Sequence, residues 1–488
     1  MAVELRRNGV LVAAYGVQPA ALEAMQWYMT YDRKELVQER GKSKTVTSTY
    51  RQWYVQEDGA IVFPVGFVPR VCGIIAAYGD VVSRYFRRDR SDALRLDLSR
   101  VNCTGLRPEQ VQMLQAVDGN EGGQLISPTG SGKSYGMQEI CAMYPEASII
   151  ICAPGRETVS TMCRYLQERF GKDGVGQVGG GKRHTRRITV STFNSILRVD
   201  NVEKVDILLA DEGHRTPAVL FERNLMAVTS PLKRFMFTAT PEGRYDNAEL
   251  VMESLFGPQL VNIPFQQSVA NGSVLPVHII VKDQPHGPSD AELRRYPAGP
   301  FRDRVAIWRN NKRNDMIAKD VQEVMSTYDD PQVLVLVDKT EHALILHKYL
   351  PDFELVHGTV DAGRRAQFKK QALLGEDDKM LTPSERDAVR KRFESGESRR
   401  VLATQVFATG VSADQCQIVA IASGSGSVIQ FLQSLGRAAR KSDATGKTHA
   451  TAMIWRDTFS FAYTGRATRL IDAATREQHY ITRVPCQR

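Results

Sequence analysis

Cysteine is scarce in this 488-residue chain and forms no metal-binding or disulfide pattern. The seven cysteines are scattered, at positions 72, 103, 141, 152, 163, 416 and 486, and no two of them form a Cys-x-x-Cys pair. No group of cysteine and histidine has the spacing of a zinc site. This distribution predicts free thiols in a reducing compartment and excludes a zinc finger or a disulfide-stapled secreted domain.

Long apolar runs are also absent. No window approaches the roughly 20 consecutive apolar residues that cross a bilayer, so we expect no membrane span. The opening MAVELRRNGVLVAAYG has only a weak apolar run and no small-residue cleavage pattern, so we expect no signal peptide. Both absences favour a cytoplasmic protein.

Charge of one sign is only mildly in excess. Lys and Arg number 64 against 55 Asp and Glu, which gives a net charge of +9 and a pI near 9.1. This excess permits a polyanionic partner without requiring one. The length predicts two to four domains, because a single core does not grow to this size.

The pattern of apolar runs changes along the chain. Residues 1–100 mix a helix-like stretch at 19–29 with strand-like runs such as AIVFPVGFV, and carry 15 basic against 11 acidic residues. They predict a small α+β accessory domain that could bind duplex or branched DNA. Trp53, Tyr54 and Phe63 could make such a contact, but core positions are the simpler interpretation. In 101–265 and again in 266–488, short apolar runs alternate with helical segments, which predicts βαβ units and parallel sheets, an α/β fold.

An unusual segment interrupts the second of these α/β regions. VDAGRRAQFKKQALL and LTPSERDAVRKRFESG each resemble a charged helix that begins after a turn, and the acidic GEDDK joins them. The pair predicts a helical insertion around residues 359–396, with a solvated structural insert as the simplest interpretation.

A glycine-rich loop stands between a strand-like and a helix-like segment. SPTGSGKS follows GQLI and precedes YGMQEICAMY, which is the context of a phosphate-binding loop. Gly130 and Gly132 would let backbone N–H groups close around phosphate oxygens at a helix N-terminus. Lys133 would reach the β- and γ-phosphates, and Ser134 would offer its hydroxyl to Mg²⁺. Ser127 replaces the first glycine of the motif and still permits the turn.

An acidic pair ends the strand-like run VDILLADEGH. A carboxylate at the end of a strand near a phosphate-binding loop holds Mg²⁺ in nucleotide hydrolases, which assigns that task to Asp211. Glu212 is then placed to orient or deprotonate the attacking water. Asp211 and Glu212 alone would fit an ordinary polar strand end. Together with Lys133 in the phosphate-binding loop, they favour nucleotide hydrolysis.

The stretch QSLGRAARKS raises the question of two close arginines. A helix would place Arg437 and Arg440 on one face, where the two cations repel unless an anion lies near them. A solvated basic face is the simplest interpretation. With a phosphate site elsewhere in the chain, both arginines become candidates for meeting charge on the γ-phosphate.

In this order, the motifs resemble those of superfamily 2 helicases over about residues 104–445. The matching segments are LRPEQVQML, SPTGSGKS, CAPGRETV, VSTFNSI, DEGH, FTATP, LVDKTEHALIL, LVHGTVD, ATQVFATGVSAD and QSLGRAAR. The resemblance implies two tandem RecA-like parallel-sheet domains preceded by the small α+β domain. It also implies ATP and Mg²⁺ as cofactors and a nucleic acid as partner.

The resemblance further implies roles for single residues. Nucleotide binding falls to Arg107, Gln110 (adenine), Pro128, Thr129, Gly130, Ser131, Gly132, Lys133, Ser134 and Gly410. The catalytic group comprises Lys133, Asp211, Glu212, Gln433, Arg437 and Arg440, with Ser134 and Asp211 holding the metal. The resemblance assigns the coupling of ATP hydrolysis to movement to His214, Thr238, Ala239 and Thr240. Nucleic-acid contacts fall to Pro154, Gly155, Arg156, Thr192, His357, Gly358 and Thr404, and the basic loop GGGKRHTRR is a further candidate.

Within the superfamily, the chain is most similar to phage UvsW-type helicases that remodel branched DNA. RNNKRNDMIAKDV, DKTEHA, GTVD and FATGVSAD carry this likeness. It implies single-stranded, forked or junction DNA bound without sequence specificity, and the host cytoplasm for a phage-encoded protein. Ser412 stands where many superfamily 2 proteins have an aspartate, so a contact made by that aspartate is not transferred.

Three functions follow as alternatives. The first is a DNA helicase that unwinds or branch-migrates forked DNA in recombination, repair or replication. The second is an RNA-directed ATPase, or a duplex translocase that does not separate strands. The third is a non-enzymatic scaffold, against which the intact set of Lys133, Asp211, Glu212, Arg437 and Arg440 argues.

Overall fold

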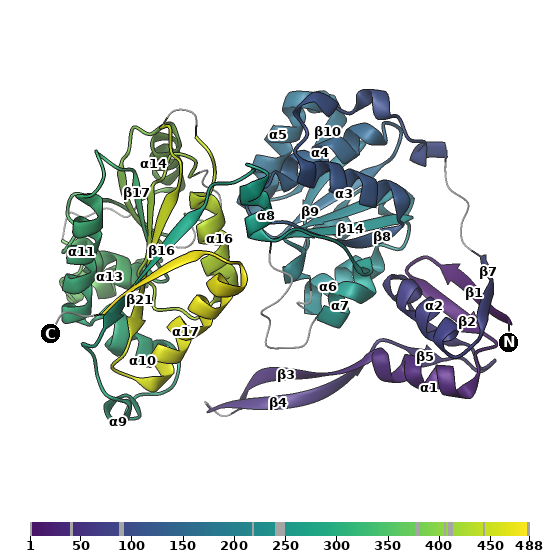
Figure 1. Cartoon of the computed structure of the whole chain (residues 1–488), viewed down its shortest axis with the longest axis horizontal. Helices are drawn as coiled ribbons and strands as arrows, with labels where there is room; N and C mark the ends of the chain where they lie inside the picture. Colours follow the sequence, from purple (N-terminus) through teal and green to yellow (C-terminus); the bar gives the residue numbers. More distant parts are fainter. Residues whose placement is uncertain are drawn as a thin grey trace. The chain divides into compact units, whose positions relative to one another are not determined.

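The computed structural model describes residues 2–39, 42–86, 92–216, 219–239, 249–375, 381–404, 407, 413–442 and 445–485. The chain forms two compact units, Met1–Ile263 and Pro264–Arg488. Figure 1 shows the first unit in purple to teal and the second in teal to yellow. In the described ranges, no helix is both long enough and apolar enough to cross a membrane.

The first unit begins with a small α+β domain. Its sheet has the order β5-β6-β2-β1-β7 and is joined by two helices. The elements are β1 (Ala2–Asn8), β2 (Leu11–Tyr15), α1 (Pro19–Tyr28), β5 (Tyr54–Val55), β6 (Ile61–Pro64), α2 (Val68–Ala77) and β7 (Val81–Phe86). Phe63 is fully buried in its core, whereas Trp53 is half-buried and Tyr54 is 50% exposed, so the core prediction holds for Phe63 and is wrong for Tyr54.

The strand expected over AIVFPVGFV ends halfway. After Pro64 the chain makes a 3-10 turn at Val65–Phe67, and α2 begins with a proline in its first turn. Proline fixes φ near the helical value and lacks the N–H that a strand would need. The apolar run therefore divides into a short strand and the start of a helix.

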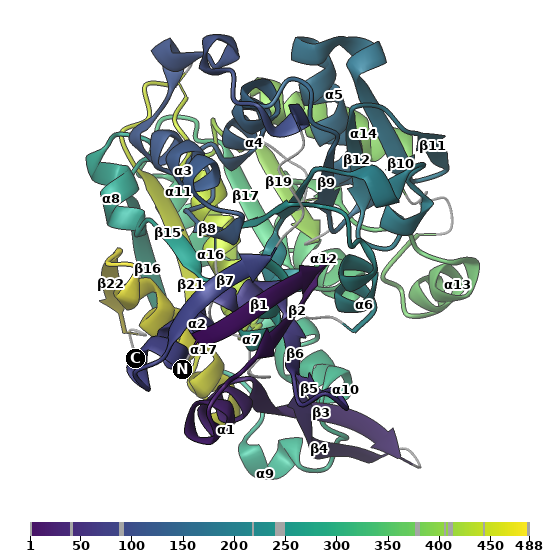
Figure 2. The ribbon, with the colours of Figure 1, turned by 90° about the vertical axis from the view of Figure 1, so that its right-hand side faces the viewer.

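A long β-hairpin extends from this domain. Strands β3 (Thr30–Glu39) and β4 (Lys42–Arg51) pair antiparallel with each other, from Thr30 opposite Arg51 to Glu39 opposite Lys42. Figure 2 shows the ribbon standing clear of the five-stranded sheet. At its base, Tyr31 stacks on Tyr50 with ring centroids 5.7 Å apart. Tyr31 is buried in an apolar cluster of the α/β domain that follows, so the hairpin base is anchored there.

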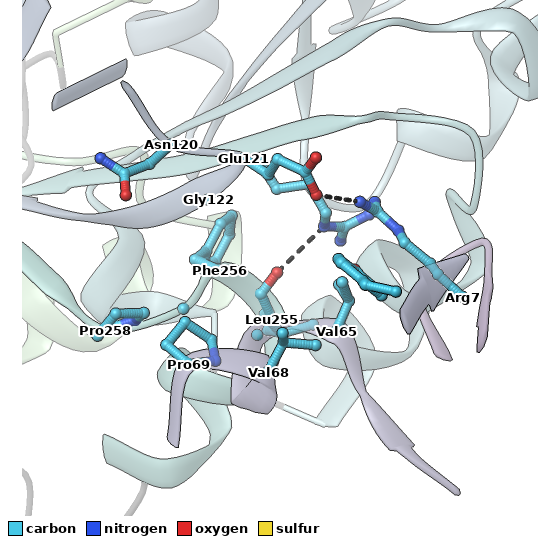
Figure 3. Close-up of a pocket in the computed structure, with 14 residues that line it drawn as sticks. Arg7, Val65, Val68, Pro69, Asn120, Glu121, Gly122, Leu255, Phe256 and Pro258 are labelled. Atoms are coloured by element: carbon cyan, nitrogen blue, oxygen red, sulfur yellow. Dashed lines mark hydrogen bonds and ion pairs between the residues drawn. The ribbon is translucent and has the colours of Figure 1, made fainter. Parts of the chain in front are cut away.

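Ion pairs and close packing fasten the small domain to the α/β domain. Arg7, from β1, donates to Glu121 at 2.9 Å and to the Pro231 carbonyl at 3.0 Å. Figure 3 shows these side chains beside a cavity of about 190 Å³ between the two parts. Gly66 packs so closely that a Cβ there would lie 1.9 Å from the Glu253 carbonyl oxygen. The first unit therefore contains the small domain as an integral part.

The α/β domain of the first unit has an eight-stranded sheet in the order β11-β10-β12-β9-β13-β14-β8-β15. All pairings are parallel except that between β10 and β11. The strands are β8 (Gly122–Ile126), β9 (Ile149–Ala153), β10 (Val175–Gly179), β11 (Lys182–His184), β12 (Ile188–Thr192), β13 (Ile207–Asp211), β14 (Lys233–Thr238) and β15 (Gln259–Asn262). The helices are α3 (Pro108–Gly119), α4 (Lys133–Met143), α5 (Arg156–Gly174), α6 (Val219–Ala227) and α7 (Glu249–Phe256).

The second unit has a seven-stranded, wholly parallel sheet in the order β18-β19-β17-β20-β21-β16-β22. The strands are β16 (Val277–Gln284), β17 (Val333–Val337), β18 (Glu354–Val356), β19 (Arg400–Thr404), β20 (Ile418–Ile421), β21 (Ala450–Asp457) and β22 (Tyr480–Val484). The helices are α8 (Phe265–Ala270), α9 (Asp290–Leu293), α10 (Pro300–Asp303), α11 (Asn311–Met325), α12 (Thr340–His347), α13 (Ala362–Lys370), α14 (Pro383–Ser395), α16 (Val428–Ala438) and α17 (Phe461–Arg476).

Two of these helices, α13 and α14, lie in the segment expected as a solvated insertion. Phe393 of α14 is fully buried and Val389 is 6% exposed, and both belong to the core of the second unit. Arg392 also donates to Glu354 of β18. One face of α14 is therefore core, because its apolar residues recur at helical spacing between the charged ones.

The predicted fold class is confirmed: two RecA-like α/β domains follow a small α+β domain. In a parallel sheet the carboxyl ends of all strands meet at one edge, where such folds bind their ligands. In the first unit this edge collects the ends of β8, β13 and β14.

Candidate active site

The glycine-rich loop connects β8 to α4 as a tight anion-binding turn. Gly130 and Gly132 have φ values of 94° and 92°, in the left-handed region that favours glycine. A Cβ on Gly132 would lie 2.2 Å from the Gln110 Nε2 atom, so this position also lacks room for a side chain. Lys133 opens α4, and the helix N-terminus contributes free N–H groups and a favourable dipole for phosphate.

The Lys133 side chain is 9% exposed and bends over the loop. Its amino group donates to the carbonyl oxygens of Ser127 at 2.9 Å and of Pro128 at 3.1 Å. Ser131 donates to the Pro128 carbonyl at 2.8 Å. These carbonyl oxygens carry only partial charge, so a phosphate oxygen with a full negative charge would outcompete them for the Lys133 amino group.

Arg107 and Gln110 brace the loop from the start of α3. Arg107 donates to the Gly130 carbonyl at 2.9 Å, and Gln110 donates to the Gly132 carbonyl at 3.2 Å. The Gln110 Oε1 atom accepts from the Arg107 backbone N–H at 2.8 Å. The Thr129 hydroxyl is buried without a hydrogen-bond partner among the described residues. Buried polar groups are normally satisfied, so this hydroxyl fits a site that a ligand completes.

Asp211 and Glu212 stand at the end of β13. Asp211 is 8% exposed. Burial and the neighbouring Glu212 charge raise the pKa of Asp211 to about 7, and the Lys133 charge opposes this rise. Glu212 has a φ of 52°, and its backbone N–H donates to Asp211 Oδ1 at 3.1 Å. The backbone is therefore in the left-handed region at Glu212, directly after the end of β13. Ser134, the other predicted metal ligand, is exposed at the start of α4.

A short chain of contacts links Glu212 to β14. His214 Nδ1 lies 3.2 Å from Glu212 Oε2 and 3.0 Å from Thr238 Oγ1. The Thr238 carbonyl accepts from the Ser127 N–H at 3.0 Å, where the glycine-rich loop begins. Ala239 follows directly and is half-buried, while Thr240 lies outside the described residues. Of the predicted coupling residues, His214 and Thr238 therefore connect Glu212 to the start of the glycine-rich loop.

The predicted nucleic-acid contacts of the first unit gather beyond β9 and β12. Pro154 and Gly155 follow β9, and Arg156 begins α5. A Cβ on Gly180, in the basic loop after β10, would lie 3.8 Å from the Arg156 side chain, and one on Gly179 would lie 3.3 Å from Thr192. These segments, distant in sequence, therefore share one edge of the sheet.

Part of the basic loop has a different environment. Arg187 donates to the carbonyl oxygens of Tyr144 at 3.1 Å and of Ala147 at 3.3 Å, near the C-terminal end of α4. Burial lowers the pKa of Arg187. These contacts give Arg187 a structural role as a cap, so we do not count it among the candidate nucleic-acid contacts.

The predicted contacts of the second unit also follow strand ends. His357 comes after β18 and is 4% exposed, and burial lowers its pKa. Its Nδ1 atom lies 2.8 Å from the Gly358 carbonyl oxygen. Thr404 ends β19, and its hydroxyl is buried without a partner among the described residues. Gly410 and Ser412 lie outside the described residues.

The arginine pair occupies the end of α16. Gln433 and Arg437 lie within the helix, but the helix ends at Ala438, so Arg440 comes two residues after it. The expectation that one helical face carries both arginines is therefore wrong. Lys447 donates to the Ala438 carbonyl at 2.8 Å, which caps the helix before Arg440. Arg440 Nη1 lies 3.4 Å from Asp414 Oδ1.

Sequence reasoning missed a buried basic pair in β14. Lys233 donates to the Val117 carbonyl at 2.6 Å, and Arg234 donates to the carbonyls of Val228 and Leu225 at 2.7 and 2.9 Å. Burial lowers the pKa of Arg234 to about 9. Both side chains donate hydrogen bonds to backbone carbonyl oxygens near the ends of α3 and α6, behind the site. A basic pair inside an otherwise apolar strand is the only signal of this role.

Family models match both α/β regions. The model described as "Type III restriction enzyme, res subunit" matches residues 104–243. The model described as "Helicase conserved C-terminal domain" matches residues 316–442. The chain is also similar to the DNA 3'-5' translocase XPB2 of Sulfurisphaera tokodaii, with 24% identity over 353 residues that cover 69% of this chain and 79% of that protein.

Solved structures also match the chain at low identity. A putative HsdR subunit of a type I restriction enzyme from Vibrio vulnificus matches with a TM-score of 0.56 and 17% identity, over 94% of this chain and 92% of that one. T4 UvsW aligns over 100% of this chain and 99% of its own, with a TM-score of 0.43 and 14% identity. A nucleotide-binding helicase region followed by a helicase C-terminal region is the arrangement of superfamily 2, and the chain belongs to the ATP-dependent helicases of that superfamily.

Proposed function

We propose that this helicase uses ATP to translocate on DNA and to remodel branched DNA, such as forks and junctions, in recombination, repair or replication. The observation that carries the proposal is the hairpin-bearing α+β domain fastened to the ATP-binding domain by Arg7–Glu121 and by Tyr31. An element held in this way moves with the ATP-binding domain. The similarity to a protein named a DNA 3'-5' translocase supports DNA as the track.

ATP would bind with its phosphates on the glycine-rich loop. The N–H groups from Thr129 to Ser134 would hold the phosphates, and Lys133 would exchange its carbonyl partners for the β- and γ-phosphate oxygens. Pro128 and Ser131 shape the loop. Arg107 and Gln110, which brace the loop, would contact the adenine end of the nucleotide.

Mg²⁺ fits the donor set beside this loop. Ser134 and Asp211 supply the oxygen ligands that hard divalent cations prefer, and the Asp211 carboxylate lies within the electrostatic reach of Lys133. Bound there, the ion would neutralise charge on the phosphates. The fit of Mg²⁺ to this chain rests on Asp211. The Asp211 carboxylate is buried, and the positive charge of Lys133 stabilises its charged form.

Glu212 would accept the proton of the attacking water. Asp211 would hold the metal, so the two adjacent acids would have separate roles. Gln433, Arg437 and Arg440 of the second unit would meet the negative charge that develops on the γ-phosphate. Gly410 would contact the nucleotide from the same unit. Release of the γ-phosphate would then remove the anion shared by the two units.

Coupling would run through His214 and Thr238, which link Glu212 to the strand that ends at the glycine-rich loop, and on to Ala239 and Thr240. DNA would lie along the strand ends of both units. Its contacts would be Pro154, Gly155, Arg156 and Thr192 in the first unit, and His357, Gly358 and Thr404 in the second. Such contacts go mainly to phosphates, so binding would be independent of sequence and would weaken with salt.

Steady-state ATP hydrolysis tests the proposal. The rate is measured with no polymer, with single-stranded DNA, with duplex DNA, with a synthetic four-way junction and with RNA, each at matched nucleotide concentration. We expect stimulation by DNA that is greatest with the junction. Stimulation by RNA alone would transfer the protein to the RNA-directed class, and equal stimulation by blunt duplex and junction would favour a duplex translocase.

A further inference from the structure

The α+β domain presents an aromatic groove that the ATP site does not use. Trp27 and Tyr28, at the end of α1, are 72% and 42% exposed. Their ring centroids are 4.9 Å apart and their planes cross at 83°. A groove of about 450 Å³ opens beside them, and Tyr31, Arg70 and Leu250 also line it. This volume is within the range of small-ligand sites.

The groove wall is rigid. The Arg70 guanidinium lies 5.5 Å from the centre of the Tyr28 ring. Arg70 is itself held by Glu253 of α7, with Nε–Oε1 and Nη2–Oε2 distances of 2.6 and 2.5 Å. Tyr28 is therefore fixed between Arg70 and the Trp27 indole, and Trp27 rests edge-on against a positioned ring. A preset, exposed aromatic face loses little conformational freedom when a ligand stacks on it.

The charges around the groove select its occupant. Asp32 lines the groove, and its Oδ1 atom accepts from Thr49 at 2.7 Å. A carboxylate at this position disfavours a phosphate in the groove itself. The hairpin strands Thr30–Glu39 and Lys42–Arg51, the first of which starts three residues after Trp27, have five basic residues against three acidic ones in their sequence. A groove that takes a neutral planar group next to a basic ribbon matches a nucleobase next to its phosphate chain.

We propose that Trp27 stacks on an unpaired base of a DNA strand, with the strand's phosphates running onto the basic hairpin. Paired bases inside a duplex hide their faces by stacking on one another, so this groove takes a base only where a strand has opened. The site would therefore recognise the single-stranded arm at a branch. It rests on the proposed function and adds to it a contact that distinguishes branched from blunt DNA.

The test compares Trp27→Ala, Trp27→Phe and the control Tyr78→Ala in the full-length protein. Tyr78 is 46% exposed in the same domain and does not line the groove. Equilibrium binding is measured on a labelled fork with single-stranded arms and on a blunt duplex of equal length, at one salt concentration. Loss of one stacked base should weaken fork binding by roughly 5- to 150-fold for Trp27→Ala. Blunt-duplex binding should change less than twofold, and Trp27→Phe and Tyr78→Ala should stay near wild type on both.

A fluorescence measurement reports the contact directly. The chain has four tryptophans, of which Trp308 and Trp455 are buried and Trp53 is half-buried. Oligothymidylate should quench part of the wild-type emission, and Trp27→Phe should remove most of that quenching. Unchanged fork affinity in Trp27→Ala, together with unchanged quenching in Trp27→Phe, would overturn the stacking site and favour a protein partner for the groove. If wild-type ATPase responds to no DNA at all, the proposed function itself fails, and this result is separate from the Trp27 comparison.

Discussion

Glu212→Gln separates proton transfer from nucleotide binding. Glutamine has nearly the same shape as glutamate, keeps the backbone at φ 52° as glutamate does, and retains the N–H that donates to Asp211 at 3.1 Å. The substitution therefore removes one negative charge and one proton acceptor. A positioned general base contributes about 10²- to 10⁴-fold to the rate. The activation free energy should rise accordingly, by roughly 3 to 5 kcal/mol.

Binding of nucleotide should survive the same change. Glu212 places its charge next to the buried Asp211 carboxyl, and its removal lessens the repulsion between the two acids. We therefore expect kcat at saturating DNA to fall by about 10²- to 10⁴-fold, while the Kd for a fluorescent ADP analogue changes by less than about threefold. Phosphate release gives kcat, and equilibrium titration gives Kd. The exposed Glu203→Gln, in the same domain, serves as the matched control.

Two results would refute this reasoning. A Glu212→Gln protein that keeps a tenth or more of the wild-type kcat would show that another group accepts the proton. Because Glu212 also contacts His214 at 3.2 Å, His214→Gln is tested in parallel. His214→Gln should retain DNA-free hydrolysis and lose part of the stimulation by DNA. If it reproduces the full loss of kcat, the effect of Glu212 acts through His214.

Further predictions concern the ATP site and the second unit. Lys133→Ala should abolish ATP turnover in the phosphate-release assay. Arg437→Ala should lower kcat by about 10³- to 10⁵-fold, and normal turnover with DNA bound would contradict its γ-phosphate role. Arg313 is fully buried and pairs with Asp457 at 2.7 Å. Arg313→Met should cost about 3–5 kcal/mol of unfolding free energy in denaturant titrations, and adding Asp457→Leu should restore much of it. Burial lowers the pKa of His479 to about 4, against about 6.5 in the unfolded chain. Between pH 6.5 and pH 4 the unfolded chain binds a proton at His479 that the buried imidazole does not bind. The free energy of unfolding therefore falls by about 3 kcal/mol as pH drops from above 6.5 toward 4. His479→Leu should flatten this part of the unfolding profile, whereas the exposed His286→Gln should leave it unchanged.

The parallel sheets were the most predictable part of the fold. Runs such as GQLIS, SIIICAP and VDILLADE are mostly apolar and end in polar or turn residues, because a strand buried on both faces has no polar side. They became β8, β9 and β13. The rule that parallel strands end at one edge was enough to bring Lys133, Asp211 and Thr238 into one neighbourhood.

Elements that depend on distant contacts were not predictable. The hairpin at 30–51 has mostly polar residues in both strands, and its anchor, Tyr31, is buried by a domain that begins seventy residues later. The end of α16 before Arg440 depends on Lys447 reaching back to the Ala438 carbonyl. Lys233 and Arg234 look like surface residues in sequence, and only the helix ends around them explain their burial.

The brace between Gln110 and the glycine-rich loop is of the same kind. A resemblance assigns Gln110 to adenine, whereas its amide in the structure contacts the Gly132 carbonyl and the Arg107 N–H. A short motif specifies residue types and their spacing, but it does not specify the hydrogen-bond partner of each side chain.

The close fit of Gly66 against α7 has a practical consequence for truncation. Sequence composition places a natural-looking boundary near residue 100, yet removal of everything before it would uncover the Glu253 and Ser254 carbonyls and the apolar cluster that Tyr31 completes. A shortened protein would then lose activity through aggregation of the ATP-binding domain, and the loss would be mistaken for a missing DNA contact. Surface substitutions that leave this seam intact are the sounder way to learn what the first hundred residues contribute.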